Sequence, residues 1–166
     1  MDGKLIFEGA YRLAIVQQIR TALKSIDVTA FEWQWYEGQR AGTAQDINRE
    51  VCTACRRDIT IKALLHNEAK NRHIGKINRK TAGHLRKCGV DVKFNPMQKM
   101  LHAKLWIFDR KVAVLGSHNM SNSAMSKNLE VSYLVTEPAE IFSLCEWFDG
   151  IWSGGIPHLG GVTDPG

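Results

Sequence analysis

Hydrophobic residues follow a helical spacing in some segments of this chain and a strand-like alternation in others. In YRLAIVQQIRTALKS the apolar residues recur at helical spacing, and Ile15, Ile19, Ala22 and Leu23 share one face. The next segment, IDVTA, alternates apolar and polar positions as a strand does, and ITIKALL repeats that alternation farther along. These three segments therefore predict one helix and two strands.

Further helices are predicted between and after these strands. One runs from about Thr43, a candidate cap, to Arg57. Another runs from about Lys76 to Lys87 and leads through Gly89 into the strand VDVKF. Strands that alternate with helices predict an α/β fold in which helices sandwich a mixed sheet.

Length and segment composition predict the domain organisation. A chain of 166 residues is most simply one domain, and we expect residues 1–152 to form it. The glycine-rich end SGGIPHLGGVTDPG, residues 153–166, is expected to be a flexible tail. No apolar run approaches the ~18 residues of a membrane span, and MDGKLIFEGAYRLAIV does not have the pattern of a secretory signal. We therefore expect a cytoplasmic location.

Charge is distributed unevenly along the sequence. From Arg56 to Lys99 there are 12 Lys and Arg against 3 acids, a local charge of +9. Residues 130–166 hold 6 acids and no Lys or Arg, a local charge of −6. A basic segment of this kind is typical of a surface that binds a polyanion, and it is equally typical of a solvated helix face.

Four cysteines are too few for a dense disulfide framework, and we expect them to be reduced. Cys52 and Cys55 form a CxxC, which with His84 and Cys88 makes up a conceivable zinc site. The preferred interpretation is that Cys52 and Cys55 are two small apolar side chains on one helix face. The sequence thus predicts no metal and no cofactor.

The segment LHAKLWIFDRKVAVLGSHN is predicted to be a β-hairpin. Alternation places His102, Lys104 and Trp106 on one face of the first strand, with the histidine and lysine about 7 Å apart. Asp109 opens the turn, and VAVLG returns as the second strand. Two polar groups on one face of an otherwise apolar strand call for a functional explanation.

These residues resemble the HKD signature of the phospholipase D superfamily. His102, Lys104 and Asp109 match HxKxxxxD, a GSxN follows after six residues, and SKNLEVSYLV supplies the glutamate that follows the motif. The order of predicted elements agrees from roughly Leu5 to Trp152. The resemblance implies a phospholipase D-like fold and a site that needs two HKD copies. With one copy, the chain is similar to the short bacterial endonucleases and mitochondrial members that complete the site as homodimers.

The resemblance also implies a role for each residue. His102 of one subunit would attack phosphorus, and His102 of the other would protonate the leaving group and then activate water. Lys104, Ser117 and Asn119 would bind the non-bridging oxygens, while Glu130 would hold the far ring nitrogen of His102. Asp109, although part of the motif, is expected to act mainly through the turn.

Two further residues are candidates for substrate binding. His118 departs from the apolar residue usual within GSxN, so it is either an extra phosphate donor or simply an exposed side chain. Trp35 belongs to the segment FEWQWY, whose aromatic side chains either stack on bases or pack in the core.

The sequence favours a nuclease that acts on DNA or RNA without a metal, because one motif accompanies a strongly basic segment. The alternatives are a phospholipase or phosphatidyltransferase, and a catalytic subunit that works with an ATPase or within a restriction or defence complex. A higher oligomer than the dimer is a further option.

Overall fold

A computed structural model describes residues 3–38, 41–69 and 72–158. Its eight strands form one sheet in the order β1-β7-β6-β5-β2-β3-β4-β8. The strands are β1 (Lys4–Phe7), β2 (Ser25–Ala30), β3 (Thr60–Leu65), β4 (Asp91–Phe94), β5 (Lys104–Phe108), β6 (Val112–Gly116), β7 (Val131–Val135) and β8 (Ile156–Pro157). The helices are α1 (Ala10–Thr21), α2 (Gln45–Arg56), α3 (His73–Cys88), α4 (Asn122–Ser126) and α5 (Pro138–Ser153).

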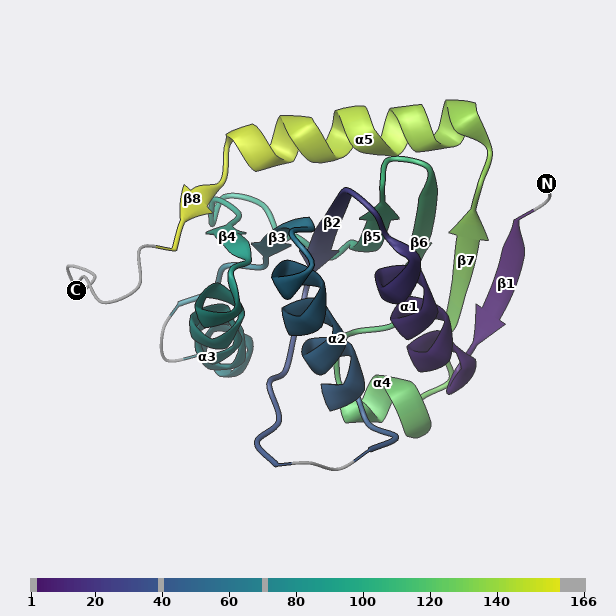
Figure 1. The fold of residues 1–166 in the computed structure, drawn as a ribbon. Helices are drawn as coiled ribbons and strands as arrows, with labels where there is room; N and C mark the ends of the chain where they lie inside the picture. The colour runs from purple at the N-terminus through teal and green to yellow at the C-terminus, as the bar shows by residue number, and fades with distance from the viewer. Residues whose placement is uncertain (1–2, 39–40, 70–71, 159–166) are drawn as a thin grey trace.

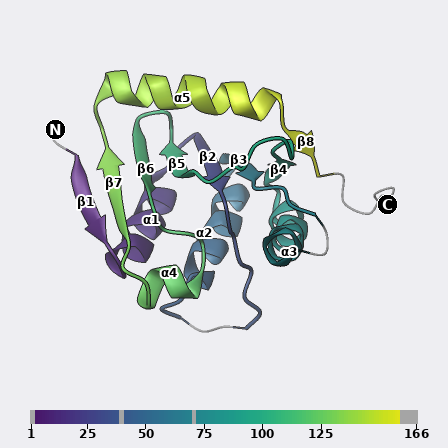
Figure 2. The ribbon, with the colours of Figure 1, turned by 180° about the vertical axis from the view of Figure 1, so that it is seen from behind.

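The sheet is mixed because its two halves are connected differently. Strands β2, β3 and β4 are parallel and are joined through α2 and α3, whereas β5, β6, β7 and β1 pair antiparallel. Helices α1, α2 and α3 cover one face, and α5 runs across the other (Figure 1). Seen from behind, strands β1, β7 and β6 have no helix in front of most of their length (Figure 2). The predicted α/β fold with a helix-covered mixed sheet is confirmed.

Two hydrophobic clusters hold these layers together. The larger one joins the sheet to α1, α2 and α3 and contains Ile15, Ile26 and Trp106. The smaller one joins Leu105 and Ile107 to α5. Successive side chains of β5 therefore pack on opposite faces of the sheet, which confirms the alternation predicted from the sequence.

Several element boundaries differ from the prediction. The hairpin strand begins at Lys104, so His102 lies in the preceding segment rather than inside the strand. Helix α1 ends at Thr21, which leaves Leu23 80% exposed instead of buried on the helix face. Thr43 lies one residue outside the cap of α2. Strands β1, β7 and β8 and helices α4 and α5 were not among the predicted elements.

The first part of the predicted tail belongs to the fold. Helix α5 continues to Ser153, and β8 pairs with β4 through Lys93 and Phe94. The folded domain therefore extends past its predicted end at residue 152, because a short strand after that residue completes the sheet. Residues 159–166 of the predicted tail lie outside the described residues.

The prediction that the cysteines are reduced is wrong for two of them. Cys52 of α2 and Cys88 at the end of α3 form a disulfide, while Cys55 and Cys145 are free thiols. The bond uses two of the four side chains of the conceivable zinc site, and in the described part of the chain no three His, Cys, Asp or Glu residues are grouped to hold a metal. Disulfides are more typical of oxidising compartments, and the cytoplasmic location stays a prediction.

None of the helices in the described ranges is long and apolar enough to cross a membrane.

Candidate active site

The candidate site lies where the ends of five strands meet. Strands β2 and β3 end here, β5 and β7 begin here, and β6 arrives antiparallel with Gly116 opposite Lys104. The hairpin register therefore brings the end of β6, and with it Ser117, beside the start of β5. The crossover segment before β5 adds His102 at the same edge of the sheet.

His102 and Lys104 are in direct contact. The Lys104 ammonium Nζ lies 3.2 Å from Nδ1 and 3.3 Å from Nε2 of the imidazole. Phe31, directly after β2, contacts the same imidazole with ring centroids 4.7 Å apart, and its ring also lies 5.2 Å from Lys104 Nζ. The half-buried aromatic ring of Phe31 therefore contacts both polar groups of the predicted pair.

Burial lowers the pKa of both groups. Partial burial is the main reason that the His102 pKa lies below its ordinary value, and the Lys104 charge lowers it further. Burial also lowers the pKa of Lys104, against the opposing effect of Glu130 and Glu32. A histidine with a lowered pKa is neutral near pH 7, which is the form that a nucleophile requires.

Ser117 and Glu130 lie next to each other at the neighbouring strand ends. The Ser117 hydroxyl donates to the Glu130 carboxylate and accepts a hydrogen bond from the Val131 N–H at 3.1 Å. Asn128 Nδ2 donates to the other carboxylate oxygen of Glu130 at 3.0 Å. The carboxylate thus contacts Ser117 and Asn128, rather than the ring nitrogen of its own His102 that the resemblance implied.

Asn119 is half-buried, and its side-chain oxygen Oδ1 has no hydrogen-bond partner among the described residues. Buried polar atoms are nearly always paired, because leaving one unpaired destabilises the fold. The side-chain oxygen of Asn119 is therefore available to a hydrogen-bond donor that the described residues do not supply.

His118 occupies the interior and not the surface of the site. Its ring is fully buried and stacks on Tyr11 at a centroid distance of 4.1 Å. One ring nitrogen is 2.8 Å from the Ser132 hydroxyl and the other is 3.1 Å from the Glu8 carbonyl oxygen. Since both nitrogens are used within the fold, we assign His118 no phosphate contact.

Asp109 lies at the opposite end of β5 from the site. Its carboxylate accepts hydrogen bonds from the backbone N–H groups of Leu23, Lys24 and Ser25 at 2.8, 2.7 and 3.0 Å. Burial acts to raise its pKa, but these hydrogen bonds outweigh it and the pKa is lowered. Asp109 therefore anchors the turn to the start of β2, which is the mainly structural role expected of it.

Trp35 is half-buried and stacks on His84 of α3, with ring centroids 4.6 Å apart and planes within 3°. It also packs against the larger hydrophobic cluster, and its ring stacks on α3 and not on His102.

The sequence reasoning missed Phe31 and His66 as residues of the site. Phe31 lay within the aromatic segment, but nothing in the sequence distinguished it from Trp35. His66 follows β3, stacks on Phe31 at 5.0 Å and accepts a hydrogen bond from the Leu101 N–H at 3.3 Å. His66 ends an alternating apolar run, a position at which a histidine in this fold can be expected to face the sheet edge.

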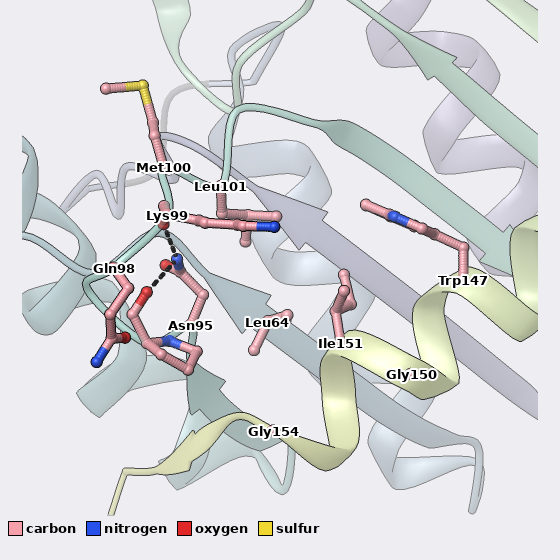
Figure 3. A pocket seen from close by; sticks show the side chains of 11 residues that line it. Leu64, Asn95, Gln98, Lys99, Met100, Leu101, Trp147, Gly150, Ile151 and Gly154 are labelled. Carbon is pink, nitrogen blue, oxygen red and sulfur yellow. Dashed lines mark hydrogen bonds between the residues drawn. The ribbon is translucent and has the colours of Figure 1, made fainter.

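An apolar cavity opens beside the site. It has a volume of about 460 Å³ and lies between α5 and the segment that leads from β4 to His102. Leu64, Leu101, Ile151 and Trp147 line it, and Asn95 closes one end by bonding the backbone around Lys99 (Figure 3). Leu101 immediately precedes His102, so the cavity is adjacent to the His102–Lys104 pair.

The open mixed sheet and the histidine–lysine pair at its edge define a phospholipase D-like protein. The family described as "Cardiolipin synthase, PLD-like domain" matches residues 15–152, and the chain belongs to this family of the phospholipase D superfamily, whose members are phosphodiesterases.

Individual relatives agree with this assignment. The chain is 35% identical over 77 residues to mitochondrial cardiolipin hydrolase of Homo sapiens, a match that spans 46% of this chain and 30% of the human protein. The fold is similar to Nuc of Salmonella typhimurium, a phospholipase D family member, with a TM-score of 0.77, 19% identity and coverage of 95% and 99% of the two chains. NucT of Helicobacter pylori gives a TM-score of 0.75 at 19% identity and the same coverage. Phosphatidylserine synthase of Haemophilus influenzae gives 0.74 at 19% identity, over 98% of this chain and 40% of the other.

Proposed function

We propose that the protein is a nuclease that cleaves phosphodiester bonds of DNA or RNA through a phosphohistidine intermediate, without a metal, at a site shared by two chains. The observation that carries the proposal is the contact between His102 and Lys104 at 3.2 Å, in a setting that lowers the pKa of the imidazole. Membership of a phosphodiesterase family and the basic segment from Arg56 to Lys99 support it.

The chemistry proceeds in two displacements. A ring nitrogen of His102 attacks phosphorus, the bond to the leaving oxygen breaks, and the protonated His102 of the second chain gives that oxygen its proton. The second histidine, now neutral, takes a proton from water, whose oxygen attacks phosphorus and breaks the phosphorus–nitrogen bond. Lys104 and the Asn119 side-chain N–H groups donate to the non-bridging oxygens and stabilise the charge that develops on them. Ser117 joins them by exchanging its hydrogen bond to Glu130 for one to the phosphate.

In this scheme Glu130 acts on the other chain of the dimer and not on its own. Within one chain its carboxylate contacts Ser117 and Asn128. We infer that it orients the ring of the second chain's His102, which would fix the tautomer of that ring.

An exposed apolar face beside the site is suited to the second chain. Leu5 and Phe7 of β1 are 56% and 57% exposed. They lie directly opposite Tyr133 and Val131 of β7, and Tyr133 lies opposite Leu115 of β6. The strand face formed by these five side chains is left uncovered by α5 (Figure 2). Exposed apolar faces of this kind mark interaction sites, and Val131 also bonds Ser117 of the site.

A lipid phosphodiester is the second candidate substrate. The apolar cavity beside Leu101 and His102 has room for part of an acyl chain. The names of the matching family and of the human relative both refer to cardiolipin. The basic segment favours the nucleic acid, because a lipid headgroup offers a single phosphate region and not an extended polyanion.

The test is to incubate the purified chain, in excess chelator, with a small chromogenic phosphodiester, labelled DNA, labelled RNA and phospholipid vesicles. We expect turnover of the chromogenic diester and of a nucleic acid, and its loss by at least about a thousandfold in His102→Ala, because the nucleophile and the acid both disappear.

Asp109→Ala serves as the matched control within the same motif. It removes the acceptor of three backbone N–H groups and should lower the free energy of unfolding by about 1 to 3 kcal/mol while the folded enzyme still turns over. A fully active His102→Ala, or activity that depends on an added divalent ion, would contradict the proposal.

A further inference from the structure

The exposed side of α3 carries only basic and neutral side chains. The helix from His73 to Cys88 contains no Asp or Glu. Lys76, Lys80, His84 and Lys87 follow one another at steps of four, four and three residues, so they form a single row along the helix. The three lysines are exposed and His84 is half-buried. At ~1.5 Å per residue the row is about 16 Å long.

The buried side of the same helix holds the segment that leads out of the active site. Asn78 Oδ1 accepts from the Trp33 N–H at 3.0 Å, and Asn78 Nδ2 donates to the Phe31 carbonyl at 2.8 Å. Thr81 donates to the Trp33 carbonyl. Both side chains are fully buried, so these bonds are shielded from water and fix the segment against α3.

The segment therefore connects His102 to the lysine row. It begins at Phe31, which contacts His102, and reaches Trp35, which stacks on His84 in the middle of the row. Four extended residues span about 13 Å. The middle of the lysine row thus lies within a few nucleotides' length of the scissile position.

An acidic residue at the row does not abolish its positive charge. Glu37 pairs with Lys80 at 3.0 Å, and the two side chains are 73% and 54% exposed. Exposed ion pairs contribute little net free energy, so a phosphate can displace this carboxylate. Lys76 and Lys87 have no ion pair with any residue in the described ranges.

We propose that the row of Lys76, Lys80, His84 and Lys87 on α3 binds the phosphate backbone of a nucleic-acid strand that continues outward from the scissile bond. The stack on Trp35 holds the imidazole of His84 in the row, and the lysines neutralise successive phosphates. This inference rests on the proposed nuclease function and adds to it a second, non-catalytic contact region for the same substrate.

The experiment measures binding without turnover, in a His102→Ala background, by fluorescence anisotropy of a labelled single-stranded oligonucleotide at several salt concentrations between about 50 and 200 mM. Replacing Lys76, Lys80 and Lys87 together by Gln should weaken binding about tenfold or more. The slope of log affinity against log salt should become shallower by about 2, since each lost phosphate contact removes about 0.7.

A matched variant replaces Arg20, Lys24 and Lys111 by Gln. These three exposed residues change the net charge equally but lie at the opposite end of the strands, by the end of α1, the start of β2 and the β5–β6 turn. Its affinity and salt slope should stay close to those of the parent. Should the triple α3 variant unfold, each single Lys→Gln variant should still reduce the slope by about 0.7.

The inference is overturned if the α3 and control variants bind equally well. It is also overturned if the α3 lysines are needed for binding vesicles of anionic phospholipid and not the oligonucleotide. Wild-type turnover of the chromogenic diester is measured separately, so failure of the proposed function and failure of the lysine row are distinguished.

Discussion

At the scale of single residues, the protein places a lysine beside a partly buried histidine, where its charge makes that histidine a weaker base. Burial and the neighbouring Lys104 charge both lower the pKa of His102. The cost of holding two such groups together is limited by the adjacent Phe31 ring, whose face attracts the ammonium 5.2 Å away. The pair is thus arranged so that the imidazole stays neutral while the lysine stays charged.

The electrostatic effect of Lys104 can be measured directly. We expect NMR titration to give a His102 pKa below the ordinary value of about 6.5, and a higher value in Lys104→Met, which removes the charge. The matched control Lys111→Met, at the far end of the hairpin, should leave the His102 pKa unchanged.

The pH dependence of the catalytic rate should reflect the lowered pKa of His102. The rate rises as pH increases through the lowered pKa of the attacking histidine, which must lose its proton, and falls when the acid partner loses its own. The two rings titrate as a coupled pair, so the bell-shaped profile reports the pair and not one residue. An unshifted His102 in the wild-type chain would be inconsistent with this interpretation.

At the scale of secondary-structure elements, the disulfide ties α2 to α3. Cys52 and Cys88 are 36 residues apart in sequence, so the bond restricts a long loop in the unfolded chain. Helix α3 in turn holds the Phe31–Trp35 segment through Asn78 and Thr81. The bond therefore stabilises the element on which both the site and the lysine row depend.

Reduction should lower the free energy of unfolding by about 2 to 4 kcal/mol, measured by urea denaturation with and without reductant. The double variant Cys52→Ala/Cys88→Ala should have the lowered stability from the start and show no response to reductant. Alkylation of the unreduced, denatured protein should label only Cys55 and Cys145. Labelling of all four cysteines would show that the bond is absent.

At the scale of the whole molecule, the proposed site is incomplete in one chain because it contains one His102. Suppose wild-type and His102→Ala chains are unfolded together with the disulfide intact, and are then refolded as random pairs. If the site is shared, only wild-type pairs act and activity falls as the square of the wild-type fraction. Equal mixing then leaves about a quarter of the activity, against about a half if each chain carries its own site.

The exposed apolar face gives this prediction a second measurement. Leu5→Glu with Phe7→Glu should yield monomers in sedimentation and lose activity, because charges are placed on the proposed contact face. The matched control is Leu13→Glu with Leu23→Glu, two leucines that are 58% and 80% exposed elsewhere on the surface. Monomers that remain fully active would rule out the shared site.

The sequence by itself determined the fold class and the family motif. Period-two and period-3.6 patterns identify half-buried strands and helices because they follow local backbone geometry, and ITIKALL and VAVLG were placed within a residue or two on that basis. The motif residues His102, Lys104, Ser117 and Glu130 were also identified from the sequence, but the register that brings the end of β6 beside the start of β5 comes from the structure.

Only the tertiary structure decided which side chains meet across the sheet. His118 and Asn119 are neighbours in one motif, yet His118 is buried against Tyr11 while Asn119 keeps an unpaired oxygen. Phe31, and not Trp35, contacts His102, and Cys52 bonds Cys88 although Cys55 is nearer in sequence. Such pairings depend on how separate elements pack against one another, and residue spacing along one element carries no information about them.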